Sequence, residues 1–181
     1  MDDAALVRKC LDGDQQACKQ LFDAHASSML SLCMRYFTSK AEAEDAVQDG
    51  FIKIFQNLHQ WTASGPLAAW VRRIMVNTCL TSIRKKFPET DFDLAEHHQN
   101  LTVNPDIISQ MDYQRIRSLL DQMPVGYRTV FNLFVIEGYQ YDEIAEMLQI
   151  KETTCRSQLF RAKNFLANRL SKEYPELKLS L

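Results

Sequence analysis

No stretch of this sequence stays apolar over the roughly 18 consecutive residues that a membrane-spanning helix needs. The first residues, MDDAALVRKC, are acidic and lack the apolar centre of a secretory signal peptide. Glycine and proline are scarce, with five of each among 181 residues, whereas an all-β chain needs many of them for its turns. These absences argue against a membrane-inserted or secreted protein and disfavour a β fold. We expect a cytoplasmic protein built from helices.

The sequence also lacks the clustered ligands of a metal site. Its five cysteines, Cys10, Cys18, Cys33, Cys79 and Cys155, are scattered and include no C-x-x-C pair, so they predict neither a zinc site nor a disulfide framework. Each lies at an apolar position of a helical pattern, which indicates reduced thiols in the core. The four histidines are not grouped with acids or cysteines. We therefore expect no metal, no cofactor and no small-molecule substrate.

Apolar residues at helical spacing fill two parts of the chain. Hydrophobic residues make up 46% of the sequence, which is enough for a packed core. Between the two parts, residues 89–106 contain five acids, no Lys or Arg, and little apolar periodicity. The sequence thus predicts an all-α protein with two small helical domains, residues 1–88 and 107–181, joined by an acidic flexible linker over 89–106.

In the N-terminal part, helical spacing begins near residue 3 and is broken at residues 12–14, where Asp14 is expected to cap the next helix. Ser39 and Glu42 fit an S-x-x-E capping box at the start of another helix. A loop containing Ser, Gly and Pro is predicted over 59–67. The amphipathic helix that follows is expected to end at Pro88.

The stretch YDEIAEMLQIKETTCRSQLF predicts two helices with a tight corner between them. Gln149 stands at the corner where Gly is usual, and Lys151 is a poor N-cap. Arg and Gln side chains pair with the major-groove edges of guanine and adenine, so the second helix resembles the reading helix of a helix-turn-helix. The alternative is a helical hairpin with an ordinary solvated face. The side chains expected opposite the apolar stripe are Arg156, Gln158, Arg161 and Lys163.

A helix over 68–87 combines aromatic and basic residues. It holds five basic residues and no acid between Arg72 and Lys86, with Trp70 at its start and Trp61 in the loop before it. Aromatic rings stack on unpaired bases while cations hold the phosphates, so this segment predicts binding to single-stranded nucleic acid. The alternative is that both tryptophans belong to the core and the basic run is solvated.

The carboxylates of AEAEDAVQDGF do not form a catalytic site. No histidine lies near them to share acid–base work, and the helical period places Glu44, Asp45 and Asp49 on an exposed face. A solvated face or a protein-docking face remains. We expect that the protein is not an enzyme.

Three motifs occur in a fixed order: AEAEDAVQDGFIKIFQNL, AAWVRRIMVNTCLTSIRKK and MPVGYRTVFNLFVIEGYQYDEIAEMLQIKETTCRSQLFRAKNFL. Together they closely resemble the sigma-70 family, and more narrowly its extracytoplasmic-function (ECF) type, which keeps only regions 2 and 4. The resemblance extends from about residue 10 to about residue 170. It implies a promoter-specificity factor that binds core RNA polymerase and directs transcription initiation at −10 and −35 promoter elements.

The resemblance also implies roles for residues of the N-terminal part. The helix after Ser39 matches the segment that docks on the polymerase β′ clamp helices, through Asp45, Gln48, Asp49, Ile52 and Phe55. The loop and helix that follow match the part that melts the −10 element and holds a flipped base, with Trp61, Ser64, Trp70, Arg73, Asn77, Arg84 and Lys85.

In the C-terminal part, the resemblance implies contacts to the −35 element and the polymerase β flap. The linker matches the segment threaded near the RNA exit path, and an anti-sigma factor is an expected partner. The −35 sequence preference does not carry over, because Gln158 stands where many members have Arg. Thr153 and Cys155 replace a common Gly and Val, which should alter packing but not the docking mode. The individual loop at Trp61 likewise leaves the preferred −10 base open. The expected −35 residues are Arg156, Ser157, Gln158, Phe160, Arg161 and Lys163.

Two other classes of protein share parts of this pattern. A stand-alone helix-turn-helix regulator would carry a sensor or receiver in its N-terminal half, but residues 1–88 lack the strand–helix alternation of a receiver. A helical adaptor would use its charged faces to bind proteins only. DNA binding by the 107–181 segment would separate the adaptor from the other two.

Overall fold

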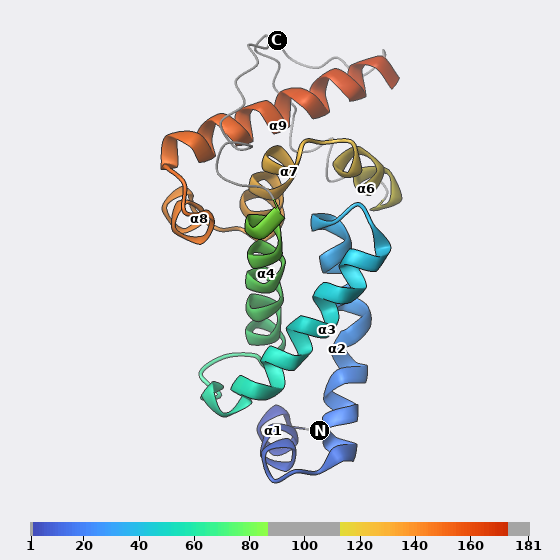
Figure 1. Ribbon diagram of the computed structural model, residues 1–181, viewed down its shortest axis with the longest axis vertical. Coiled ribbons are helices and arrows are strands. Elements are labelled where there is room, and N and C mark those ends of the chain that lie inside the picture. Colours follow the sequence, from blue (N-terminus) through green and yellow to red (C-terminus); the bar gives the residue numbers. More distant parts are fainter. Residues whose placement is uncertain (1, 87–112, 174–181) are drawn as a thin grey trace. The chain divides into compact units, whose positions relative to one another are not determined.

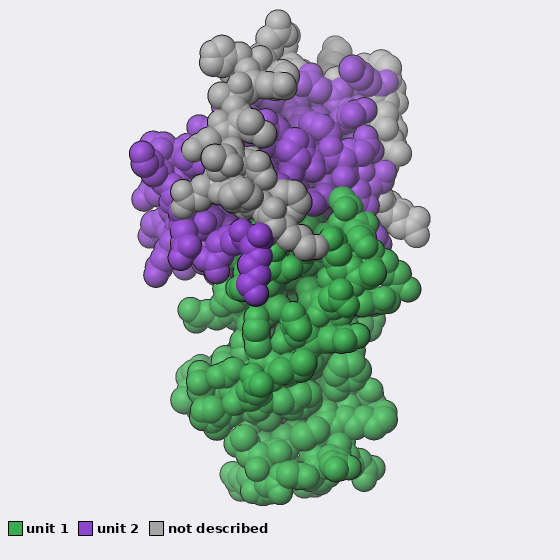
Figure 2. Space-filling model, in the orientation of Figure 1, with its two compact units in different colours: residues 1–83 green, residues 84–181 purple. Residues whose placement is uncertain are grey.

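The computed structural model describes residues 2–86 and 113–173, and the regular secondary structure of this part of the chain is entirely helical, with no strand. The all-α prediction is confirmed for these residues. The predicted linker, Pro88 and the first residues of the predicted second domain, 107–112, lie outside them. The chain divides into two compact units, residues 1–83 and 84–181 (Figure 2).

The first unit is built from long helices connected by short turns (Figure 1). The predicted break near residue 13 is confirmed, because one helix ends at Leu11 and the next begins at Gln15. The predicted loop contains a short 3-10 turn and ends where the next helix begins, at Leu67. The elements are α1 (Asp3–Leu11), α2 (Gln15–Tyr36), α3 (Lys40–Asn57), η1 (Leu58–Gln60) and α4 (Leu67–Lys86).

Of the two helix caps predicted in this unit, the one at Asp14 is present and the one at Ser39 is absent. Asp14 caps α2, since its Oδ1 accepts hydrogen bonds from the backbone N–H groups of Gln16 at 2.9 Å and Ala17 at 3.1 Å. Ser39 precedes α3 as predicted, but its hydroxyl makes no capping hydrogen bond, so the capping box is wrong. α3 contacts α2 instead, and such packing stabilises a helix more than a single cap does.

Close packing between α3 and α4 depends on a glycine. A Cβ atom at Gly50 would lie 2.5 Å from Sδ of Met75, which is fully buried. The missing side chain therefore leaves room for Met75 between the two helices. α3 and α4 can then meet along faces that also carry polar side chains.

All five cysteines carry free thiols, and four of them are buried. Sγ of Cys33 and Sγ of Cys79 lie 3.5 Å apart in the core of the first unit. Burial, with smaller effects from Cys18 and Asp14, raises the pKa of Cys10 to about 11, and burial raises that of Cys155 to about 11 as well. These thiols are protonated at neutral pH, as expected for packing residues.

The second unit contains the predicted corner between two helices. Pro124 precedes α7, and Gly138, with φ +81°, lies beyond its π-helical extension. Gln149 adopts the left-handed conformation at the corner, with φ +59°, in place of the usual glycine. The elements are α6 (Tyr113–Asp121), α7 (Val125–Phe131), η3 (Asn132–Ile136), α8 (Tyr141–Leu148) and α9 (Glu152–Glu173).

Candidate nucleic-acid interface

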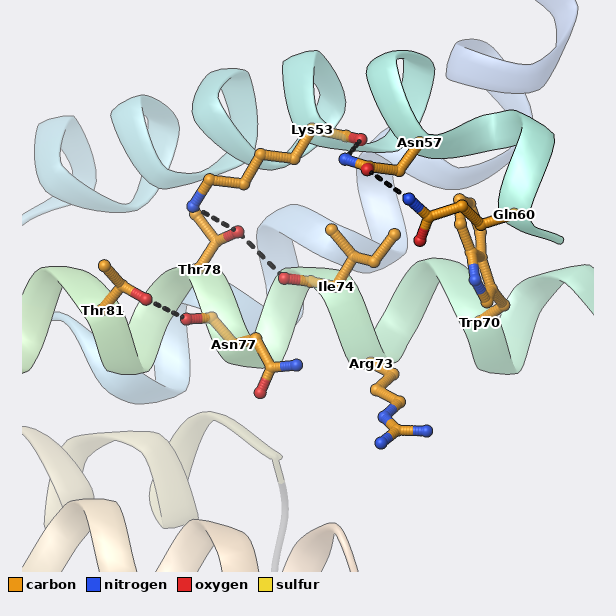
Figure 3. Close-up of a pocket in the computed structure, with 9 residues that line it drawn as sticks. All are labelled: Lys53, Asn57, Gln60, Trp70, Arg73, Ile74, Asn77, Thr78 and Thr81. Carbon is orange, nitrogen blue, oxygen red and sulfur yellow. Dashed lines mark hydrogen bonds between the residues drawn. The ribbon is translucent and has the colours of Figure 1, made fainter. Parts of the chain in front are cut away.

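A pocket of about 360 Å³ lies between α3 and α4 of the first unit (Figure 3). One wall comes from the end of α3 and the η1 turn, and the other comes from α4. Its lining is mixed, with one aromatic ring, amides, hydroxyls and two cationic side chains. The lining residues are Lys53, Asn57, Gln60, Trp70, Arg73, Ile74, Asn77, Thr78 and Thr81.

Hydrogen bonds hold the α3 wall of the pocket in place. Nδ2 of Asn57 donates to the carbonyl oxygen of Lys53 at 2.8 Å, and its Oδ1 accepts from Nε2 of Gln60 at 2.9 Å (Figure 3). Nζ of Lys53 donates to Oγ1 of Thr78 at 3.3 Å, and Thr78 in turn donates to the carbonyl of Ile74 at 2.9 Å. These bonds link α3 to α4 and fix the positions of the amides and the ammonium group.

The structure brings together three of the seven residues expected to contact the −10 element. Trp70, Arg73 and Asn77 line the pocket, with Trp70 half-buried and the other two exposed. Trp61 and Ser64 lie on the loop before α4, and neither lines the pocket. The remaining two, Arg84 and Lys85, lie in the last turns of α4, also outside the lining.

Sequence reasoning missed the wall that α3 supplies. Lys53, Asn57 and Gln60 are polar residues at spacings of four and three, and this spacing places them on one side of the α3–η1 segment. That periodicity was a readable signal for a polar stripe. It did not indicate which helix the stripe would face.

A second face of α3, next to the pocket wall, presents an exposed ridge at helical spacing. Asp45, Gln48 and Asp49 are exposed, and Ile52 is 55% exposed, which is high for a large apolar residue. Phe55 is half-buried, and its ring centroid lies 6.3 Å from that of Phe51. Acids beside an exposed isoleucine suit a protein surface that carries cations around an apolar centre.

On α9, one face carries most of the expected −35 residues. Arg156, Ser157, Phe160 and Lys163 are exposed, and Arg161 is half-buried. The guanidinium of Arg156 lies 4.3 Å from the ring centroid of Tyr141 in α8 and 3.3 Å from a carboxylate oxygen of Glu152. These contacts orient Arg156 before any ligand binds.

Gln158 does not lie on that face, so its predicted exposure is wrong. It is 1% exposed, because it lies three residues after Cys155 and four before Ala162, both of which are fully buried. Neither end of its amide has a hydrogen-bond partner among the residues that the structure describes. The helical period already contained this information, since position 158 falls on the apolar stripe that runs through Cys155 and Ala162.

Comparison with known proteins decides the family. The family model for Sigma-70 region 2 matches residues 21–87, and the model for Sigma-70, region 4, matches residues 113–166. Their order agrees with the order of the three motifs, and together they cover well over half of the chain. The chain belongs to the sigma-70 family. It is a sigma factor of the ECF type that provides promoter specificity in transcription initiation.

Relatives of this sigma factor match almost its whole length. The ECF RNA polymerase sigma-E factor of Haemophilus influenzae is 26% identical over 182 residues, which cover 94% of this chain and 96% of the relative. That of Escherichia coli K12 is 28% identical, covering 94% and 95%. Sigma factors as a class are non-enzymatic initiation factors.

Two solved structures share the fold of this sigma factor. CnrH, solved in complex with the cytosolic domain of CnrY, aligns with a TM-score of 0.52 and 22% identity, covering 94% of this chain and 98% of CnrH. The sigma factor RpoE of Bartonella quintana, solved with the anti-sigma factor NepR, aligns with a TM-score of 0.52 and 20% identity, covering 88% and 97%.

The described residues contain neither a membrane-spanning helix nor a cluster of metal ligands. Among residues 2–86 and 113–173, no helix has the length and apolarity to span a membrane. In the same part of the chain, no three His, Cys, Asp or Glu side chains gather as a metal site would require.

Proposed function

We propose that the first unit opens and reads the −10 element while the second unit reads the −35 element. Both would act while the protein is bound to core RNA polymerase. The observation that carries this proposal is the pocket between α3 and α4, because its size and lining suit one unstacked base. The domains would be residues 1–88 and 107–181, with residues 89–106 as the linker. The site of action would be the cytoplasm, where core polymerase and DNA are found.

The pocket has the side chains needed to hold a base outside the DNA duplex. Extruding a base costs a few kcal/mol of lost stacking and pairing. The Trp70 ring offers a stacking surface, and the amides of Asn57 and Gln60 offer donors and acceptors for a base edge. Arg73 follows Trp70 by three residues on α4, and its exposed side chain can bind the phosphate next to the extruded base.

The exposed face of α9 is suited to the major groove of the −35 element. Arg156, oriented by Tyr141 and Glu152, is the side chain best arranged to read a guanine edge. Ser157, Phe160 and Lys163 are exposed beside it, and Lys163 suits a phosphate. Gln158 is not part of this proposal, because its side chain is buried.

The ridge of α3 is the proposed contact with the β′ clamp helices of the polymerase. Asp45, Asp49 and Ile52 combine negative charge with an exposed apolar side chain, which favours a partner surface of Arg or Lys around an apolar centre. The second unit would contact the β flap. An anti-sigma factor that covered these surfaces would inactivate the protein. The polymerase would supply all catalysis.

Net charge supports a subunit that depends on the polymerase for its grip on DNA. The chain has 21 Lys and Arg against 23 Asp and Glu, a formal charge of −2. Non-specific affinity for DNA grows with the number of phosphates neutralised. Two small basic patches on a net acidic chain would therefore bind DNA weakly without the polymerase.

Run-off transcription tests the proposed function. Purified protein and core polymerase are incubated with a pool of genomic promoter fragments, and transcripts are sequenced at their 5′ ends. We expect start sites that share a −10 and a −35 sequence and that vanish when the protein is omitted. A core polymerase that is active on a nicked template but yields no such transcripts would overturn the proposal.

A further inference from the structure

A hydrogen bond connects the start of the chain with the start of α4. Oδ2 of Asp3, the first residue of α1, accepts from the backbone N–H of Leu67 at 3.3 Å. Leu67 is the first residue of α4 and lies 64 positions further along the chain. This is a long-range contact from a helix that precedes the matched region 2 segment, which begins at residue 21.

α4 has no local side-chain acceptor at this end, although the backbone carbonyl of Pro66 accepts from the N–H groups of Ala69 and Trp70. The first four N–H groups of a helix lack partners within the helix, and a side chain at the N-cap usually accepts one of them. The residue before α4 is Pro66, whose side chain has no acceptor, and the first turn of α4 has no acid. Leu67 is 1% exposed, so water has little access to it. Asp3 therefore supplies from α1 the capping carboxylate that the local sequence lacks.

This cap lies one turn from the pocket. Trp70 follows Leu67 by three residues, and Arg73 and Asn77 lie on the next two turns of the same helix. α1 also contacts the η1 turn, which precedes the loop over 61–66. α1 thus contacts the chain on both sides of this loop. A change in α1 would shift both the loop and the stacking wall of the pocket.

We propose that Asp3 is a positioning residue for −10 recognition: it caps α4 across the fold and so sets the loop over 61–66 and the Trp70 wall relative to Asn57 and Gln60. This inference rests on the proposed function of the pocket. Asp3 itself does not touch DNA in this role. The carboxylate also complements the positive ends of two helices, α1 and α4, because it lies at the N-terminus of both.

The test measures how the full-length protein with core polymerase binds a fluorescent single-stranded oligonucleotide that carries the non-template −10 sequence. Four oligonucleotides differ only at the flipped position, and their affinities define a discrimination ratio. We expect Asp3→Ala to weaken binding about threefold to tenfold, as for the loss of one helix cap, and to reduce the ratio. Affinity for core polymerase is expected to stay unchanged. Asp12→Ala, which removes an exposed acid at the other end of α1, serves as the matched control and should alter neither value.

Two further variants separate capping from a general loss of stability. Asp3→Asn keeps an acceptor oxygen and should retain most of the affinity, since Asn caps helices about as well as Asp. Pro66→Ser offers α4 a cap of its own, so Asp3→Ala should cost less in the Pro66→Ser background than in the natural one. This dependence would show that Asp3 acts through the α4 cap. The discrimination ratio then separates positioning from stability, because a smaller folded fraction weakens binding to all four oligonucleotides equally.

Each outcome has a distinct meaning. If the natural protein does not discriminate among the four oligonucleotides, the proposed function of the pocket is wrong. If it discriminates and Asp3→Ala behaves like Asp12→Ala, the function stands and the positioning role of Asp3 is overturned. The positioning role is equally overturned if Asp3→Ala lowers only the thermal melting temperature, or if its effect is equal in both backgrounds at residue 66.

Discussion

The two proposed DNA-reading sites of this sigma factor are built in different ways. The −10 site is concave, and its lining comes from two helices and a turn between residues 53 and 81. The −35 site is the outer face of a single helix, α9, braced by α8 through Arg156 and Tyr141. A concave site can enclose a base that has left the duplex, whereas a convex helix can enter a groove whose bases stay paired. The shapes of the two sites therefore match the two states of promoter DNA.

The first prediction concerns the α3 ridge, because both DNA-reading sites would act only on a protein that this ridge has docked to core polymerase. Asp49→Arg reverses the charge in the middle of the α3 ridge and should weaken core polymerase binding by about 3 kcal/mol, as for a central interface residue. Titration of labelled core polymerase measures this loss. Promoter-dependent transcripts should fall at all promoters alike, whatever their −10 and −35 sequences.

The matched control is Asp12→Arg, which makes the same charge change on exposed α1. It should leave polymerase binding intact. Equal binding by both variants would show that the docking surface lies elsewhere.

The second prediction addresses the concave site. Trp70→Ala removes the stacking wall and should reduce affinity for the single-stranded −10 oligonucleotide by about 2 kcal/mol, while Trp70→Phe keeps a ring and loses less. Fluorescence anisotropy with full-length protein and core polymerase measures both. Because Trp70 is half-buried, circular dichroism melting must accompany the assay. Normal oligonucleotide affinity in the Ala variant would show that Trp70 does not contact the −10 base.

The third prediction addresses the convex site. Arg156→Ala should lower discrimination at one base pair of the −35 element by about 1 to 2 kcal/mol if its guanidinium reads a base edge. Competition among duplexes that carry single base changes measures this effect. Lys163→Ala is the comparison, because a phosphate contact would weaken all the duplexes equally and flatten the salt dependence. A uniform loss for Arg156→Ala would assign it to phosphate as well.

The fourth prediction has the smallest expected effect and separates packing from reading within α9. Gln158→Met replaces a buried amide with an apolar side chain of similar length. This amide has no hydrogen-bond partner within residues 2–86 and 113–173. We expect a gain of about 1 kcal/mol in the free energy of unfolding, because the desolvation cost of the amide disappears. Chemical denaturation measures this gain. A changed −35 preference in the same variant would contradict a purely internal role for Gln158.

Most of the fold could be predicted from the helical period. The break before Asp14, the start of α3 after Ser39 and the corner at Gln149 all followed from local sequence signals. The capping box did not form, because the position of a helix start does not guarantee a side-chain hydrogen bond. The exposure of Gln158 was misjudged because its polar character was given more weight than its place on the apolar stripe.

The candidate sites differ in the same way: those on a single helix could be predicted from the sequence, and the pocket between two helices could be predicted only in part. The α3 ridge and the exposed residues of α9 each belong to one helix, so their spacing of three and four residues was enough to group them. The sequence indicated only the α4 wall of the pocket, because the contact between Lys53 on α3 and Thr78 on α4 is one that no local pattern encodes.

The sequence by itself determined the helices, their exposed faces and the family, because these depend on residues that are close together in the chain. Only the tertiary structure decided that the end of α3 completes a pocket with α4 and that Asp3 caps a helix 64 residues away. The physical reason is that hydrogen bonds and packing depend on distance in space. Helices bring distant residues together only when their faces pack, as α3 and α4 do at Gly50 and Met75.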